Sequence, residues 1–327
     1  MKVIFTLCSN NYLGQAIVLG KSFLKFHPEA DFMVGLVDRL DASIDYTALE
    51  PIQILPFEKL PFAQFEQMRN SYDIIEFNTS VKPFYFEYLF NLKYDKVIYL
   101  DPDIAVFSSV NELFDLLDTN DILVTPHTIT PTHAFDSKWQ KVQNLVGMYN
   151  FGFLALAKTE NTFSLLHWWQ KKLETECRMW PAEGLFVDQI WGNYFPIFFE
   201  KSYIIKDPGY NMGYWNFGER KLAYKDGRFW VNDSLLKFFH FSNIKFGKKD
   251  VISGYSDYTF TERPDLIEIY NWYFNELTEN GYLKYKQLKP SIQFRNNNEG
   301  FRKEMGKKIK FHGTKLVNTI TKHLFGV

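Results

Sequence analysis

Short apolar runs alternate with longer segments of helical periodicity along the first part of this 327-residue chain. The apolar runs, which are typical of strands, lie at residues 2–8, 31–37, 52–55 and 96–100. The helical patterns lie at Tyr12 to Phe26, from about Glu58 onward, and at Val81 to Asn91. Because a helix that links two strands favours parallel pairing with right-handed crossovers, this alternation predicts an α/β fold. We expect a doubly wound, mixed but mostly parallel sheet.

The pattern continues more loosely in the second part of the chain. We expect a short helix at Val110 to Asp118, strands at Ile122 to Thr125 and Asn150 to Ala157, and a long helix at Thr159 to Cys177. Beyond Pro196 the pattern breaks into short strands and turns, which indicates an elaboration of the same domain. The predicted organisation is one domain over residues 1–260 and a helical C-terminal extension over residues 261–327.

The charge balance and the cysteine count exclude several classes of protein. The chain has 37 basic and 38 acidic residues, so no overall field favours nucleic acid as a partner. Two cysteines, Cys8 and Cys177, do not suggest a disulfide framework or a thiolate metal site. The N-terminal apolar stretch is too short for a signal sequence, and no later segment has the roughly 18 apolar residues of a membrane span. These features predict a reduced, cytoplasmic protein.

Two carboxylates, Asp101 and Asp103, follow directly on the apolar run from Val97 to Leu100. Ligands of α/β sheets bind at the edge where such strands end. Two hard oxygen donors at this spacing can hold a divalent cation, and the cation can bind a diphosphate. The alternative is an ordinary exposed turn made of Asp and Pro. The strand before the Asp-x-Asp triplet and the apolar segment after it favour the metal site.

Five further segments accompany the Asp pair in a defined order. They are Thr6 to Tyr12, Asn78 to Phe84, Tyr149 to Leu154, Phe186 to Ile190 and His240 to Lys245. Together they resemble GT-A-fold glycosyltransferases of the family 8 type, the group that includes glycogenin and bacterial lipooligosaccharide galactosyltransferases. The resemblance covers about residues 1–250. It implies a Rossmann-like catalytic domain that binds a nucleotide-sugar.

The resemblance also implies which residues bind the donor. Thr6 and Tyr12 would contact the base and ribose of the nucleotide, with Asn11 beside them in the same segment. Lys82 would lie near the diphosphate, and Asn150 near the donor sugar. The alternatives are that Tyr12 only packs at a helix start and that Lys82 is an ordinary surface lysine.

Two residues of the fourth segment are candidates for catalysis. The resemblance places Asp188 and Gln189 beside the anomeric carbon of the donor sugar. Asp188 would accept hydrogen bonds from sugar hydroxyls, and Gln189 would offer its amide oxygen to the developing positive charge. Asp188 could instead cap a helix. A turn role and a place in the same cleft are equally open for Asn211.

His240 is the expected third metal ligand, with Asp101 and Asp103, for Mn²⁺ or Mg²⁺. The loop that follows departs from the family pattern. Asn243 stands where a glycine is expected, and Lys245 comes one position early. Lys245 is our choice for the diphosphate ligand, with Lys248 and Lys249 as alternatives.

The function implied by the resemblance is metal-dependent transfer of a hexose, with retention, from a UDP-sugar to a glycan or lipid-linked glycan acceptor of a bacterial cell surface. No carboxylate can be named from the sequence as a covalent nucleophile, so we expect front-face attack. The alternatives are a sugar nucleotidyltransferase, a catalytically silent sugar-binding module and a calcium-stabilised structural protein. Residues 6–14 lack the Gly-rich basic loop that a nucleotidyltransferase usually carries.

The C-terminal tail, residues 301–327, combines seven basic residues and one acid with apolar residues at roughly helical spacing. This pattern predicts a basic amphipathic helix that touches the inner face of a membrane and presents a lipid-linked acceptor. A helix packed on the catalytic domain is the alternative, favoured by the interruptions at Gly306 and Gly313.

Overall fold

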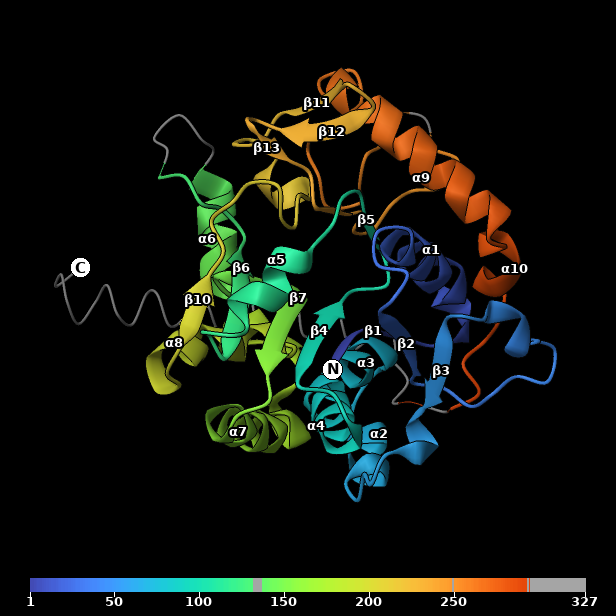
Figure 1. The fold of residues 1–327 in the computed structure, drawn as a ribbon, viewed down its shortest axis with the longest axis vertical. Helices are drawn as coiled ribbons and strands as arrows, with labels where there is room; N and C mark the ends of the chain where they lie inside the picture. Colours follow the sequence, from blue (N-terminus) through green and yellow to red (C-terminus); the bar gives the residue numbers. More distant parts are fainter. Residues whose placement is uncertain (132–136, 249, 293, 295–327) are drawn as a thin grey trace, which may run out of the picture.

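The computed structural model describes residues 1–131, 137–248, 250–292 and 294. Its centre is a seven-stranded sheet in the order β10-β6-β7-β4-β1-β2-β3 (Figure 1). The strands are β1 (Lys2–Cys8), β2 (Asp31–Leu36), β3 (Gln53–Pro56), β4 (Lys96–Leu100), β6 (Ile122–Pro126), β7 (Tyr149–Ala157) and β10 (Ser202–Ile204). The four strands β3, β2, β1 and β4 are parallel, and β10 is parallel to β6. The mixed, mostly parallel sheet predicted from the sequence is confirmed.

Strand β7 is the exception to the parallel pairing that the alternation predicts. It runs antiparallel to both of its neighbours, β4 and β6. Its first residues therefore lie at the edge of the sheet where β4 ends, with Phe153 opposite Leu100. The main-chain N–H of Asp101 donates to the carbonyl of Gly152 across this edge, at 2.8 Å. The reversed strand thus brings a second segment to the Asp pair.

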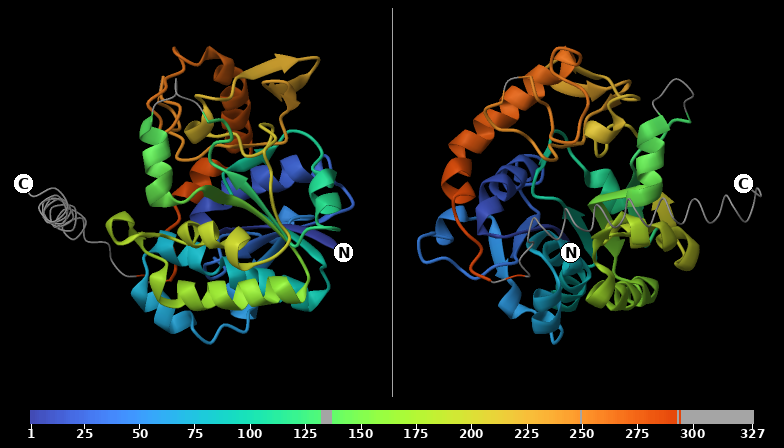
Figure 2. Two further views of the ribbon diagram at one scale, coloured as in Figure 1. Left: turned by 90° about the vertical axis from the view of Figure 1, so that its left-hand side faces the viewer. Right: turned by 180° about the vertical axis from the view of Figure 1, so that it is seen from behind.

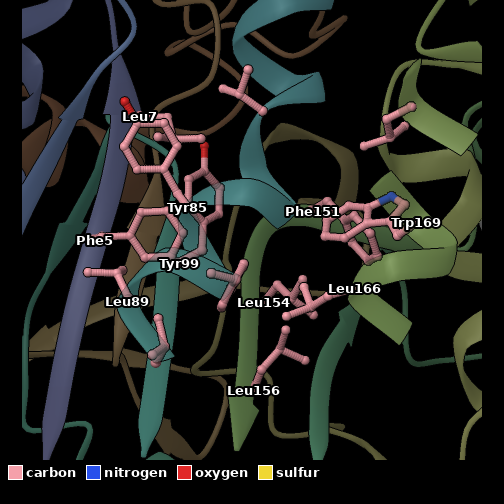
Figure 3. Close-up of a cluster of buried hydrophobic side chains, with 14 of the residues drawn as sticks. Phe5, Leu7, Tyr85, Leu89, Tyr99, Phe151, Leu154, Leu156, Leu166 and Trp169 are labelled. Carbon is pink, nitrogen blue, oxygen red and sulfur yellow. The ribbon is translucent and has the colours of Figure 1, made fainter. Parts of the chain in front are cut away.

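Helices cover both faces of the sheet. They are α1 (Leu13–Leu24), α2 (Phe65–Ser71), α3 (Ile74–Ser80), α4 (Lys82–Leu92), α5 (Asn111–Leu116), α6 (Ser137–Val146), α7 (Glu160–Glu176) and α8 (Phe195–Phe198). Alternate residues of each strand enter opposite cores because side chains in a strand have a period of two. On one face, Phe5 and Leu154 pack against Leu89 of α4 and Trp169 of α7 (Figure 3).

The other face of the sheet packs against α1 and α5. Ile4 and Ile98 belong to this core, together with Ile17 of α1 and Phe114 of α5. The strands are therefore apolar on both sides, as expected for a sheet covered by two layers of helices. The two cysteines, Cys8 and Cys177, are buried and free.

A third core lies where later segments return to the sheet. Strand β5 (Ile104–Val106) pairs antiparallel with β14 (Phe238–His240), and a small separate sheet holds β11 (Leu222–Lys225), β12 (Arg228–Val231) and β13 (Ser234–Leu235). Helices α9 (Ile267–Glu279) and α10 (Tyr282–Lys286) join this core, where the rings of Phe241 and Tyr273 stack with their centres 3.8 Å apart.

The helices α9 and α10 also lie along α1, as the orange and dark-blue segments of Figure 2 show. A Cβ atom at Gly14 of α1 would come within 2.8 Å of the Cα of Tyr282, so glycine permits this close contact. The helical C-terminal region predicted from the sequence is confirmed for these two helices. The tail 301–327 lies outside the described residues. Within the part of the chain that the structure describes, no helix has the length and apolar character needed to cross a membrane.

Candidate active site

Asp101, Asp103 and His240 come together at the carboxyl end of β4. One ligand atom from each lies within 4.8 Å of the others. The Nε2 of His240 is 3.0 Å from the Oδ1 of Asp103 and 3.6 Å from the Oδ2 of Asp101. The pairing of β5 with β14 causes this meeting, since it sets His240 opposite Ile104 and joins the N–H of Phe241 to the carbonyl of Asp103 at 2.8 Å. We call these three residues the Asp-Asp-His cluster.

Gly152 on β7 makes room for the histidine of the cluster. A Cβ atom at this position would lie 2.4 Å from the Cε1 of His240, and 2.9 Å from the Oδ1 of Asn150. A glycine within a strand often marks a place where another group approaches the backbone closely. In the structure the group that approaches is the imidazole of His240.

Burial and neighbouring charges shift the pKa values of Asp101 and His240 in opposite directions. Burial raises the pKa of Asp101, while Lys82 and His240 act to lower it. The hydroxyl of Tyr99 donates to the Oδ1 of Asp101 at 2.6 Å. Burial lowers the pKa of His240, but Asp103 and then Asp101 outweigh it, and the pKa is raised overall. A divalent cation between these atoms would satisfy both carboxylates, and the mixed oxygen and nitrogen donors fit Mn²⁺ or Mg²⁺.

Lys82 and Asp188 form a buried ion pair in the same cavity as the cluster. The Nζ of Lys82 donates to the Oδ2 of Asp188 at 2.6 Å and to the carbonyl of Phe151 at 2.9 Å. It also lies 4.2 Å from the centre of the Tyr99 ring. Burial raises the pKa of Asp188, and Lys82 opposes this shift. Lys82 is thus no surface lysine: its charge is held between the cluster and Asp188.

The segment that carries Asp188 and Gln189 has an unusual backbone. Val187 has a φ of +41°, a left-handed conformation that strains a β-branched residue. Gln189, in a 3₁₀-helix (Gln189–Tyr194), accepts from the N–H of Phe151 at 3.0 Å and donates to the carbonyl of Val146 at 2.8 Å. Its amide is therefore held by β7 and α6, with one lone pair of its oxygen already used.

A network of amides lies behind the cluster. The Oδ1 of Asn150 accepts from the N–H of Gly152 at 3.1 Å and from the Nδ2 of Asn211 at 3.0 Å. Asn211 has a φ of +53° and also donates to the Oγ1 of Thr125 at 2.9 Å. Asn211 therefore makes a tight backbone turn and supports Asn150 as well.

The sequence interpretation missed His127, which completes this network. Its Nε2 lies 3.4 Å from the Nδ2 of Asn150, and its Nδ1 lies 3.2 Å from the carbonyl of Met148. Burial lowers the pKa of His127 to about 4, so the ring is neutral at pH 7. Its position directly after β6, at the edge where β4 also ends, is the signal in the sequence that could have identified it.

The expected nucleotide residues are not all brought together. The cavity that contains the Asp-Asp-His cluster, Lys82, Asn150, Asp188 and Gln189 is not lined by Thr6, Asn11 or Tyr12. Thr6 is fully buried in β1, and the Oδ1 of Asn11 accepts from the Oγ of Ser9 at 2.7 Å.

Tyr12, at the start of α1, is 40% exposed. Its partial burial, and next the charge of Asp103, raise the pKa of its hydroxyl. Tyr12 is therefore within electrostatic reach of the cluster. Its contact with a nucleotide remains a prediction, like those of Thr6 and Asn11.

The backbone conformation of the loop after His240 explains why an asparagine can stand at position 243, where the family pattern has a glycine. Asn243 has a φ of +51°, and asparagine adopts this left-handed conformation more readily than other non-glycine residues. The Nζ of Lys245 donates to the Oδ1 of Asn243 at 2.8 Å. Lys245 does not line the cavity, and Lys249 lies outside the described residues. The lysine that meets a diphosphate thus remains a prediction.

Three aromatic residues on the cavity wall were not placed by the sequence interpretation: Tyr214, Trp215 and Tyr255. The ring of Trp215 lies edge-to-face on His240, with centres 5.0 Å apart, and on His127 at 5.8 Å. The cluster therefore has an aromatic wall, which Trp215 joins to His240.

Two proteins are similar in sequence to most of this chain. A protein of Bacillus subtilis (strain 168), described as uncharacterized protein YfnF, is 25% identical over 269 residues, which make up 81% of this chain and 89% of that protein. A second protein of the same organism, uncharacterized protein YfnD, is 24% identical over 214 residues, 62% of this chain and 67% of that protein.

Solved structures show a similar fold. The glycosyltransferase GlyE of Streptococcus pneumoniae TIGR4 matches with a TM-score of 0.50 and 13% identity, over 89% of this chain and 65% of that one. The galactosyltransferase LgtC, in complex with donor and acceptor sugar analogues, matches with a TM-score of 0.46 and 16% identity, over 92% of this chain and 99% of that one. The match to GlyE, together with the mostly parallel seven-stranded sheet, confirms the expected GT-A fold. Because the model of the family described as glycosyl transferase family 8 matches residues 3–226, more than half of the chain, this protein belongs to glycosyl transferase family 8.

Proposed function

We propose that this glycosyltransferase moves a hexose, with retention, from a UDP-sugar to a glycan or lipid-linked glycan acceptor in a metal-dependent reaction. The observation that carries the proposal is the Asp-Asp-His cluster, whose ligand atoms lie within 4.8 Å of one another. The same cavity contains the Lys82–Asp188 pair and Gln189. A cation site beside polar groups suited to a sugar is what cleavage of a sugar–diphosphate bond requires.

Asp101, Asp103 and His240 would hold the Mn²⁺ or Mg²⁺ ion. The bound ion would supply positive charge to the departing diphosphate. Lys82 would add to this charge from its fixed place beside the cluster. Asp188 would accept hydrogen bonds from hydroxyls of the donor sugar, and Gln189 would turn its free lone pair towards the carbon that becomes positive.

In the transfer step, the oxygen of an acceptor hydroxyl forms a bond to the anomeric carbon. The bond from that carbon to the phosphate oxygen breaks, and its electron pair leaves with UDP. The acceptor proton passes to the departing phosphate oxygen. Attack from the face that UDP leaves retains the configuration. The ion pair of Asp188 with Lys82 supports this front-face route, because a carboxylate bound at 2.6 Å by a lysine is a weak nucleophile.

Several further residues complete the proposed site. Thr6, Asn11 and Tyr12 would bind the uridine, Lys245 the diphosphate and Asn150 the donor sugar. The catalytic domain would extend over residues 1–260. The extension over residues 261–327 would end in the basic tail, through which the protein would touch the inner face of a membrane.

Incubation of the protein with Mn²⁺ and a panel of nucleotide-sugars tests the function. We expect release of UDP with at least one donor, whereas release of pyrophosphate would identify a nucleotidyltransferase. Asp103→Asn should abolish the release because it removes a charged ligand of the cation. Asp118→Asn, which changes an exposed carboxylate that pairs with Lys96, is the control and should leave the rate as in the parent protein. Undiminished turnover by Asp103→Asn would refute the metal assignment.

A further inference from the structure

We propose that Tyr255 is a stacking platform for a pyranose ring of the acceptor glycan. This inference rests on the proposed function and adds to it a site for the acceptor. Tyr255 lines the cavity that holds the Asp-Asp-His cluster, Asp188 and Gln189. It is 59% exposed, so much of its side chain is accessible from solvent while the rest faces the cavity.

The platform is supported from behind by a row of aromatic contacts that ends on a cluster residue. The ring of Tyr255 lies 5.6 Å from that of Tyr214, Tyr214 lies 5.1 Å from Trp215, and Trp215 lies 5.0 Å from His240, all measured between ring centres. The last two contacts are nearly perpendicular, at 80° and 83°. Edge-to-face packing of this kind is favourable for aromatic rings. The row therefore fixes the place of Tyr255 relative to the reacting centre.

The loop that carries Tyr255 is also tied to the strand end of His240. The N–H of Tyr255 donates to the Oγ of Ser253 at 3.1 Å, and this hydroxyl donates to the carbonyl of Ser242 at 2.8 Å. The N–H of Gly254 donates to the carbonyl of Asn243 at 2.9 Å. Because these bonds tie Tyr255 and the two residues before it to the segment that follows His240, a ring bound on Tyr255 would be held near the cluster.

The chemistry of this wall fits a sugar. A pyranose presents a face of C–H groups that packs on an aromatic ring, and hydroxyls at its rim that need polar partners. The Nε1–H of Trp215 is buried without a hydrogen-bond acceptor among the described residues, and Ser242 also lines the cavity. The ammonium group of Lys82, which lines the same cavity, is already bound to Asp188. The wall of Tyr255 is thus suited to a neutral ring.

The position of the wall favours the acceptor over the nucleotide. The predicted uridine residues Thr6, Asn11 and Tyr12 do not line the cavity, whereas the predicted sugar residues Asp188 and Gln189 do. A ring on Tyr255 would therefore share the cavity with the transferred sugar, while the hydroxyl of Tyr255 also lies within electrostatic reach of Tyr12. There a hydroxyl of the bound acceptor can form the bond to the anomeric carbon as UDP leaves, with the proton passing to the phosphate oxygen as described above.

The test compares Tyr255→Ala and Tyr255→Phe with the control Tyr224→Ala, which changes another exposed tyrosine, on β11. Lactose, maltose and cellobiose serve as acceptor probes, with Mn²⁺ and the donor that releases UDP. We expect Tyr255→Ala to raise the KM for the acceptor about tenfold, with a smaller change in the KM for the donor. Tyr255→Phe, which keeps the ring, should restore the parent value.

A larger effect on the KM of the donor would assign Tyr255 to the nucleotide and overturn the proposal, as would an unchanged KM for the acceptor. Saturation-transfer NMR with the same three sugars gives a reading that needs no turnover. We expect the sugar signals to weaken with Tyr255→Ala and to persist with Tyr224→Ala; equal signals, or none with the parent protein, would overturn the platform. Absence of UDP release with every donor would instead refute the proposed function.

Discussion

The Nζ of Lys82 lies 2.6 Å from the Oδ2 of Asp188, and the two side chains are only 2% and 3% exposed. These residues are 106 positions apart in the chain. A buried charge that loses its partner is strongly destabilising, whereas the removal of both charges costs much less. The pair therefore contributes to the fold as well as to the charge of the site.

The first prediction concerns this pair. Lys82→Met should lower the free energy of unfolding by about 3 kcal/mol, because it leaves Asp188 buried and unpaired. Lys82→Met combined with Asp188→Leu should recover most of the stability but no activity. Chemical denaturation and UDP release are the two measurements. Lys171→Met, at an exposed lysine that pairs with Glu174, is the control. Additive losses in the double variant would contradict the pairing.

The second prediction concerns Gly152. In Gly152→Ala the new Cβ would lie 2.4 Å from the Cε1 of His240, so the imidazole must move out of the cluster. We expect the affinity for Mn²⁺ to fall about tenfold or more, measured by calorimetry. In a His240→Ala background the same glycine change should have little further effect on Mn²⁺ binding. An equal loss in both backgrounds would show that the glycine acts independently of the histidine.

The third prediction concerns His127 and pH. Burial lowers the pKa of His127 in the folded protein to about 4, from 6.5 for an imidazole in water. The folded state therefore binds a proton less tightly than the unfolded state, and the contribution to stability is present above pH 6.5 and lost as the pH falls towards 4. The full contribution is about 3 kcal/mol. Denaturation midpoints of the parent and His127→Gln between these two pH values check it. The variant should lose less stability on acidification, and parallel curves would contradict the prediction.

The fourth prediction concerns the loop residue Asn243. Its left-handed backbone, with a φ of +51°, predicts that Asn243→Gly is tolerated. Asn243→Val should destabilise the protein by about 1 kcal/mol or more, because a β-branched residue is disfavoured in this conformation. Thermal denaturation of the two variants measures the difference. If valine and glycine gave equal midpoints, the strain at this position would be disproved.

The Asp pair and most strands could be predicted from local patterns. Asp101 and Asp103 follow a strand whose apolar residues face both cores, and that signal is contained within a few neighbouring positions. The direction of β7 could not, because a strand has the same pattern of residues whichever way it runs. The diphosphate contact that the sequence suggested for Lys82 stays a prediction, and the sequence did not indicate the bond to Asp188 that the structure shows. Residue type predicted the charge but not its partner.

Residue order alone thus accounts for the α/β class, the strand ends and the donor types of the site. Neighbours in sequence share one strand or helix, and the period of the side chains sets which face each one occupies. The meeting of His240 with the Asp pair depended on the pairing of β14 with β5, and the row from Tyr255 to His240 depended on the packing of separate loops. Such contacts join segments that are distant in the sequence and form only when those segments pack together. No single stretch of the sequence therefore predicts them.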